Sequence, residues 1–211
     1  MFSKHRLAAL SDGIFAIVMT LLILDIKVPT GIAPGGLKAA LLEDSHQWIS
    51  FAITFAISAV FWNLQRKVFE QVSEVTDVNI FLTFLSLAFV TMLPFTTSLW
   101  GHHLNERLAF FLYFANQFVI AALLTAKVEI ARGRGQVQTG LKLNALRFRL
   151  YTVCVVMGSA GLASLWVPLQ YTGFVPAGFA VAARVIRRKK FPKQVEASRA
   201  EQMELEEEGL P

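Results

Sequence analysis

Three polar residues stand near the start of the first apolar stretch of the chain: Arg6, Ser11 and Asp12. In a helix, Asp12 would lie about 7.5 Å into this stretch, at a rise of 1.5 Å per residue. A carboxylate at that depth in a membrane needs a partner or water. On a helical wheel Arg6 and Asp12 are about 120° apart, so they do not share a face. Each therefore needs a partner on another helix.

The polar groups expected to supply these partners are Gln65, Arg66 and Asn79 in the second and third apolar stretches, or groups of a neighbouring subunit. We favour a hydrogen-bonded network that holds the first helix in place. Two other interpretations stay open: Arg6 is an interfacial cation while Asp12 reaches water at the inner surface, or Asp12 attracts ions to an inner pore mouth.

The composition defines the class of protein. Of the 211 residues 55% are apolar, which is typical of an integral membrane protein. The chain has one cysteine, Cys154, inside an apolar run, so no intrachain disulfide can form. The net charge of +5 does not indicate a nucleic-acid partner, because the basic residues flank apolar stretches and contain no nucleic-acid-binding motif. The first apolar stretch is too long for a cleavable signal, so we expect a retained helix.

Apolar windows predict an all-α membrane protein with six transmembrane helices, within a channel domain of residues 1–190 followed by a polar, acidic tail of residues 191–211. The six spans are 7–26, 48–69, 78–99, 107–128, 148–168 and 170–186. Seventeen of the 20 lysines and arginines, including Lys127, fall in the terminal segments and alternate connectors. The positive-inside rule therefore predicts that both termini are cytoplasmic and that membrane lipids surround the subunit.

The segments between the spans carry further expectations. The outer loop 28–47 is expected to contain a short interfacial helix from Leu37 to Leu42, and residues 131–146 to form a flexible inner linker. Pro94 should kink or break the third span. No phosphate-binding loop and no zinc-binding motif occurs, and Ser11 has no histidine placed to activate it. We expect no enzymatic activity, no cofactor and no fixed metal site.

The polar residues of the first span also carry a family resemblance. The pattern Arg6-x-x-x-Leu10-Ser11-Asp12 resembles the Arg-x-x-x-Phe-Ser-Asp signature of the transmembrane protein 175 family, which are potassium channels of bacteria, archaea and animal lysosomes. Leu10 stands in place of the usual phenylalanine, and Gln65 and Arg66 in place of two histidines. The similarity continues in the segments Gly13-Ile-Phe-Ala-Ile17-Val, Trp62-x-x-Gln65-Arg66-Lys67 and Leu93-Pro94-Phe95-Thr96.

The resemblance implies a pore lined by the first helix on the axis of a homotetramer, because the chain has one copy of the signature. Ile17 would form the constriction, Leu21 and Leu24 the outer layers, and Thr20 would contribute a hydroxyl. These residues lie at spacings of three and four, along one stripe of a helix. Potassium ions would pass near Ile17 without a fixed metal site.

The same resemblance assigns five residues to a structural polar network: Arg6, Ser11, Asp12, Trp62 and Gln65.

The leading hypothesis is a potassium-selective channel with a hydrophobic constriction, in the plasma membrane of a prokaryote. An aliphatic ring would close by dewetting and would favour the ion that loses its water more easily. The alternatives are a secondary transporter or proton-coupled carrier, which Asp12 and the amides Asn116 and Gln117 suggest, and a membrane scaffold without transport.

Overall fold

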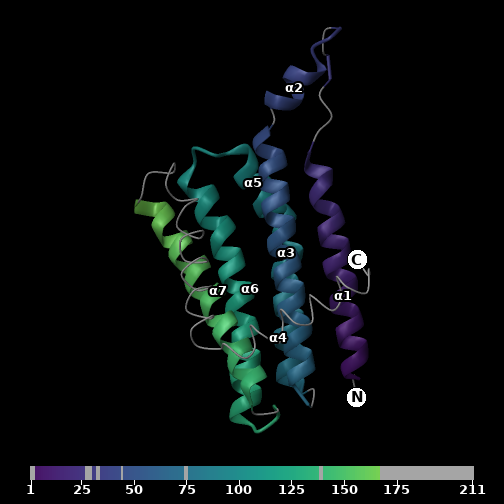
Figure 1. Ribbon diagram of the computed structural model, residues 1–211, viewed down its shortest axis with the longest axis vertical. Coiled ribbons are helices and arrows are strands. Elements are labelled where there is room, and N and C mark those ends of the chain that lie inside the picture. The colour runs from purple at the N-terminus through teal and green to yellow at the C-terminus, as the bar shows by residue number, and fades with distance from the viewer. Residues whose placement is uncertain are drawn as a thin grey trace, which may run out of the picture.

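The structure is a computed structural model that describes residues 3–26, 30–31, 34–43, 45–73, 76–137 and 140–166. Within these ranges the regular structure is helical, apart from one isolated β-bridge. The helices run as an up-and-down bundle with α1 at one edge and α7 at the other (Figure 1). Their bounds are α1 (Lys4–Leu21), the 3-10 helix η1 (Leu22–Asp25), α2 (Leu37–Glu43), α3 (Ser45–Gln71), α4 (Asp77–Thr91), α5 (Leu93–His102), α6 (Arg107–Gly133) and α7 (Leu141–Trp166).

Five of the six predicted spans are present as helices long and apolar enough to cross a membrane, among the residues that the structure describes. They are Lys4–Asp25, His46–Gln71, Asp77–His102, Arg107–Gly133 and Lys142–Trp166. The predicted sixth span, 170–186, and the acidic tail, 191–211, lie outside the described residues.

The third span is broken where Pro94 predicts a break. α4 ends at Thr91, Met92 caps it, and α5 begins at Leu93 with the proline in its first turn. Proline has no backbone N–H to donate to the preceding turn and is well suited to the start of a helix. The span is therefore two helices, and the polar face of α5 need not continue that of α4.

The connectors at the N-terminal end of α1 are more ordered than the sequence predicts. Val72 and Val137 form an antiparallel bridge, and the backbone N–H of Ser73 donates to Gln136 O at 2.9 Å. This bridge ties the turn after α3 to the turn after α6. The prediction of a flexible linker over residues 131–146 is wrong at both of its ends, because α6 continues to Gly133 and α7 begins at Leu141.

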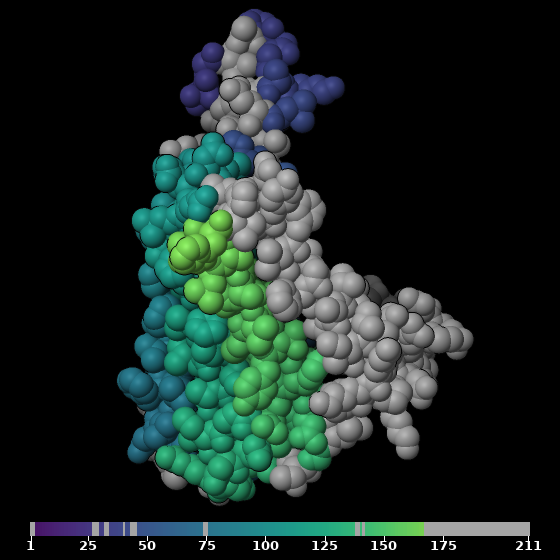
Figure 2. All heavy atoms as spheres, turned by 90° about the vertical axis from the view of Figure 1, so that its left-hand side faces the viewer, coloured from purple at the N-terminus to yellow at the C-terminus, as the bar shows by residue number. Residues whose placement is uncertain are grey.

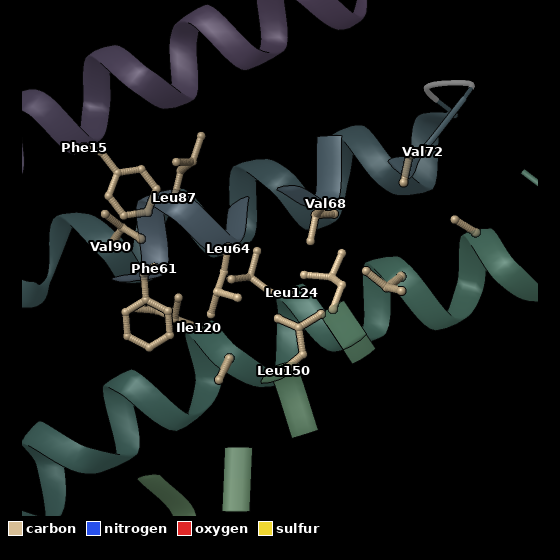
Figure 3. Packing of buried hydrophobic residues seen from close by; sticks show 14 of the residues in the cluster. Phe15, Phe61, Leu64, Val68, Val72, Leu87, Val90, Ile120, Leu124 and Leu150 are labelled. Atoms are coloured by element: carbon tan, nitrogen blue, oxygen red, sulfur yellow. The ribbon is translucent and has the colours of Figure 1, made fainter. Parts of the chain in front are cut away.

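The apolar core lies between α1, α3, α4, α6 and α7 (Figure 3). Phe15 of α1 points towards Leu87 and Val90 of α4, while Leu64 and Val68 of α3 lie beside Leu124 of α6. α6 and α7 share the most extensive helix contact in the bundle. α1 packs chiefly on α3 and α4, so one of its sides is covered by the subunit and the other is open.

The short helix predicted in the first connector is confirmed as α2. It stands beyond the end of the long helices in Figure 1, and Figure 2 shows the same end projecting from the helical body in the view from the α7 side.

Candidate functional site

The first helix has a buried face and an open face. The buried residues are Leu7, Ser11, Phe15, Val18 and Leu22, which recur every three or four residues. This period places them on one stripe of the helix. Ser11 is the polar member of an otherwise apolar stripe, so the position where α1 meets the bundle contains one hydroxyl.

The residues predicted to line a pore lie on the open face. Ile17 is 58% exposed, Leu24 is 72% exposed and Leu21 is 42% exposed in the subunit. Thr20 is exposed too, and its hydroxyl donates to Ile17 O at 2.8 Å. The Thr20 oxygen keeps its acceptor capacity in this arrangement. The other helices of the chain therefore leave a row of aliphatic side chains largely exposed.

Ser11 is 1% exposed and connects α1 to α3. Its hydroxyl donates to Leu7 O at 2.9 Å within the helix, and it accepts a hydrogen bond from Gln65 Nε2 at 3.4 Å. Gln65 itself is 2% exposed. Gln65 was expected as a partner of Arg6 or Asp12, but its amide bonds Ser11, the residue before Asp12, instead.

Asp12 receives its hydrogen bond from Trp62 of α3. The indole Nε1 donates to Asp12 Oδ1 at 2.8 Å, and the Arg66 guanidinium lies 5.6 Å from the centroid of the same indole ring. Arg66 also forms a loose ion pair with Glu70 at 3.7 Å. Arg66 therefore lies over Trp62, and the indole provides the hydrogen bond to the carboxylate.

Arg6 stands apart from these contacts. Its backbone N–H helps to begin α1 through Ser3, but its exposed side chain has no hydrogen bond or ion pair to any residue in the described part of the subunit. The sequence analysis offered a group of a neighbouring subunit as the other possible partner of Arg6, and this expectation stays a prediction.

Two residues that the sequence analysis did not assign complete the network. Lys127 of α6 donates from Nζ to Gln65 Oε1 at 2.9 Å and to Thr83 Oγ1 of α4 at 3.2 Å. Lys127 is 2% exposed, so its placement in an inner connector was wrong. The signal that points to it is the apolar period of α6, in which Leu124, Val128 and Ala131 are buried on the same face.

A cavity of about 10 Å³ adjoins this network at the end of α1, with room for about one water molecule. Lys4, Asn79, Thr83 and Lys127 are its polar lining residues. Asn79 is 6% exposed, and neither its Oδ1 nor its Nδ2 has a partner among the described residues. The expected participation of Asn79 in pairing Arg6 or Asp12 is not found in the subunit.

The other end of α1 has a separate polar contact. The Ser98 hydroxyl of α5 donates to Asp25 Oδ1 at 2.7 Å, and His102 Nδ1 lies 3.9 Å from Asp25 Oδ2. Hydrogen bonds therefore hold both ends of this span to the bundle, while the aliphatic residues between them stay open.

A bundle of long apolar helices, whose first helix combines buried polar ties with an open aliphatic stripe, defines a multi-span membrane protein. Residues 6–94 match the family model described as TMEM175, endosomal/lysosomal potassium channel TMEM175. In this segment and in its fold, the chain is similar to the TMEM175 family.

Individual relatives are similar over the same part of the chain. A protein of Streptomyces collinus named as a potassium channel is 39% identical over 106 residues, or 50% of this chain and 52% of the relative. A protein of Chamaesiphon minutus named as a potassium channel is 36% identical over 101 residues, 47% of this chain and 50% of the relative. The matched segment thus spans about half the length of these curated relatives.

A solved structure covers more of the chain. The crystal structure of a lysosomal potassium-selective channel TMEM175 homolog from Chamaesiphon minutus superposes with a TM-score of 0.72 and 26% identity, over 85% of this chain and 97% of that one. The human relative, named as an endosomal/lysosomal proton channel, is 38% identical over 100 residues, which is 44% of this chain and 20% of that protein. All of these relatives are named as channels, and none as an enzyme.

Proposed function

We propose that this chain is the subunit of a potassium-selective channel whose pore is lined by α1. The observation that carries the proposal is the division of α1 into two faces. Ser11 and Asp12 are hydrogen-bonded to α3, while Ile17 and Leu21 of α1 and Leu24 of η1 are among the exposed residues further along the span. A helix that is fixed on one side and bare on the other is what a central pore needs from each subunit.

One α1 cannot enclose a pore, so the proposal includes a closed ring of subunits. Cyclic symmetry brings the same open stripe of each copy to the axis, and the family resemblance implies a homotetramer. The exposure of Ile17 and Leu24 in the single chain is consistent with such a ring. We place this assembly in the plasma membrane of a prokaryote, in contact with membrane lipids.

The proposed constriction is the ring of four Ile17 side chains, with Leu21 and Leu24 as the next layers. Aliphatic groups offer no hydrogen bonds to an ion, so passage requires partial loss of its water, and the ring can close by dewetting. Potassium holds water less tightly than sodium and is favoured by such a ring. Thr20 adds one oxygen per subunit beside the constriction. Potassium passes near Ile17 and is not held at a fixed site.

The test is ion flux through the purified chain in liposomes that carry an outward potassium gradient. A channel gives a large flux that does not saturate, a carrier gives a slow, saturable flux, and a scaffold gives none. Because animal relatives are named as proton channels, the same vesicles should carry a pH dye. If protons cross but potassium does not, the conducted ion is the proton, and the proposal of potassium conduction is wrong.

The constriction is tested by Ile17→Ala with Val18→Ala as the matched control. Ile17 is open and Val18 is 2% exposed, although they are neighbours in the chain. Ile17→Ala should raise sodium permeability relative to potassium by up to about tenfold, a change of about 1.4 kcal/mol between the two ions. Val18→Ala should leave selectivity unchanged and cost on the order of 2 kcal/mol of stability through the cavity it leaves.

Reversal potentials in planar bilayers with potassium on one side and sodium on the other measure this ratio directly. Unchanged conductance and selectivity in Ile17→Ala would remove Ile17 from the constriction.

A further inference from the structure

Lys127 is a buried cation in the membrane-spanning part of α6, and both of its hydrogen-bond partners are neutral. Its ammonium donates to Gln65 Oε1 and Thr83 Oγ1, and it lies 5.3 Å from the centroid of the Phe69 ring. No carboxylate lies within salt-bridge distance of it in the described part of the chain. A charged side chain in such a place costs stability, and intramembrane charges therefore mark functional positions.

The hydrogen bonds around Gln65 run in one direction, from Lys127 to α1. A lysine ammonium can only donate, so the Gln65 oxygen must face α6. The Ser11 hydroxyl gives its proton to Leu7 O and can only accept from Gln65, so the amide nitrogen must face α1. Both neighbours require the same orientation of the Gln65 amide, which removes the usual ambiguity between its oxygen and nitrogen.

The direction of this chain gives Lys127 an effect beyond its own contacts. Without a donor on α6, the planar Gln65 side chain would be free to turn its nitrogen away from Ser11. Ser11 lies on the face of α1 that meets the bundle, and Ile17 lies about 120° away from it on the helical wheel. A change at Ser11 therefore changes the rotation of α1 and, with it, the direction in which Ile17 points.

We propose that Lys127 is a positioning residue for the pore-lining helix, acting through the Gln65 amide on Ser11. This inference rests on the proposed pore role of α1. In this proposal Thr83 of α4 helps to hold the Lys127 ammonium of α6, and the ammonium orients the Gln65 amide. The amide in turn holds α1 at the rotation that directs Ile17 towards the pore axis.

The experiment is a double-mutant cycle between Lys127→Met and Ser11→Ala in the full-length chain in liposomes. The two residues do not touch, so a lysine that served only local packing would give independent effects. If Lys127 acts through Ser11, each single variant should lower potassium flux per tetramer by about tenfold, a factor that corresponds to about 1.4 kcal/mol, the upper part of the range for one ordinary hydrogen bond. The double variant should be no worse than the poorer single variant.

A second readout does not depend on conduction. The indole N–H of Trp62 donates to Asp12, the residue next to Ser11, so its ¹⁵N resonance reports the seating of α1 on α3. Trp62→Phe assigns this resonance among the four tryptophans. Lys127→Met and Ser11→Ala should shift it and increase its hydrogen exchange. Lys142→Met, which removes an exposed lysine near the start of α7, should leave resonance and flux unchanged.

The outcomes separate the two proposals. If the wild-type protein carries no potassium but Lys127→Met shifts the Trp62 resonance, the channel function is wrong and the positioning role holds. If wild type conducts and Lys127→Met changes neither flux nor resonance, or if the cycle is additive, the positioning role is overturned.

If Lys127→Met fails to assemble, a second substitution can be added to restore the stability of the protein. Lys127→Met combined with Gln65→Leu replaces the polar pair by apolar side chains, which commonly restores stability. The restored tetramer should still conduct poorly, and full flux from it would also overturn the proposal.

Discussion

The hydrogen bond between Trp62 and Asp12 should couple the stabilities of α1 and α3 measurably. The indole N–H lies 2.8 Å from the carboxylate oxygen, a good distance for a bond to an ionised acceptor. Such bonds contribute about 1.5–3 kcal/mol when shielded from water. Trp62 is 37% exposed and Asp12 is exposed in the subunit, so solvent screening lowers the expectation to about 1–2 kcal/mol.

The assay is a double-mutant cycle of Trp62→Phe and Asp12→Ala, read by equilibrium unfolding in mixed micelles. Phenylalanine keeps an aromatic ring beneath the Arg66 guanidinium but has no N–H to donate. Both single variants should lose about the same free energy, and the double variant should lose little more. The coupling energy is then about 1–2 kcal/mol.

Trp100→Phe is the matched control for this cycle. The Trp100 indole packs against Tyr113 with ring centroids 4.5 Å apart, but its Nε1 is buried without a partner in the described part of the chain. The same substitution there removes no hydrogen bond, so it reports the loss of indole packing alone and should show no coupling with Asp12→Ala. Additive effects of Trp62→Phe and Asp12→Ala, within about 0.3 kcal/mol, would refute the claim that this bond anchors the first helix.

Two further predictions concern packing and burial, with unfolding free energies in micelles as the measurement. Gly101→Ala would place a Cβ 2.8 Å from Ser50 Oγ and should cost about 1–3 kcal/mol, whereas Gly133→Ala, where nothing lies within 4 Å, should not destabilise. Ser50→Ala should rescue Gly101→Ala, and a lack of rescue would mean that this contact does not set the α3–α5 spacing. Asn79→Leu should stabilise by about 1 kcal/mol, since its amide is unpartnered in the described residues. Destabilisation there would show that a water in the adjoining cavity satisfies the amide.

Hydropathy and single-residue chemistry predicted much of the bundle, because both signals are local. Long apolar windows locate five of the spans. Pro94 marks the break between α4 and α5 through its own backbone chemistry, which does not depend on the helices that pack around it. The need of Asp12 for a partner also follows from depth alone. The partner that meets it, Trp62, was named from the family resemblance and not from its chemistry, since an indole N–H is a common group that hydropathy ignores.

The end of α6 shows what a hydropathy window cannot reach. The window closes near residue 128 because charged residues follow, but the helix continues to Gly133. Glu129 accepts hydrogen bonds from Arg132 and from Arg147 of α7, and these pairs neutralise the charges that end the apolar window. Arg132 is a neighbour of Glu129 within α6, but Arg147 becomes one only after α6 and α7 pack. Lys127 lies just inside the predicted span 107–128, but it was counted with the connector because its charge suits the end of a span, although it lies about two turns inside the helix.

The same reasoning explains why α1 needs polar ties at all. An apolar side chain of a membrane helix has nearly the same free energy against lipid as against protein. Hydrophobicity therefore does not fix the rotation of the helix about its own axis. Directional bonds do fix it. Ser11 and Asp12 are held near one end of the span, and Asp25 is held by Ser98 at the other. Two fixed points along one axis determine the direction of every residue between them, including Ile17. The aliphatic stripe that we propose as the pore lining therefore does not have to hold the helix in place.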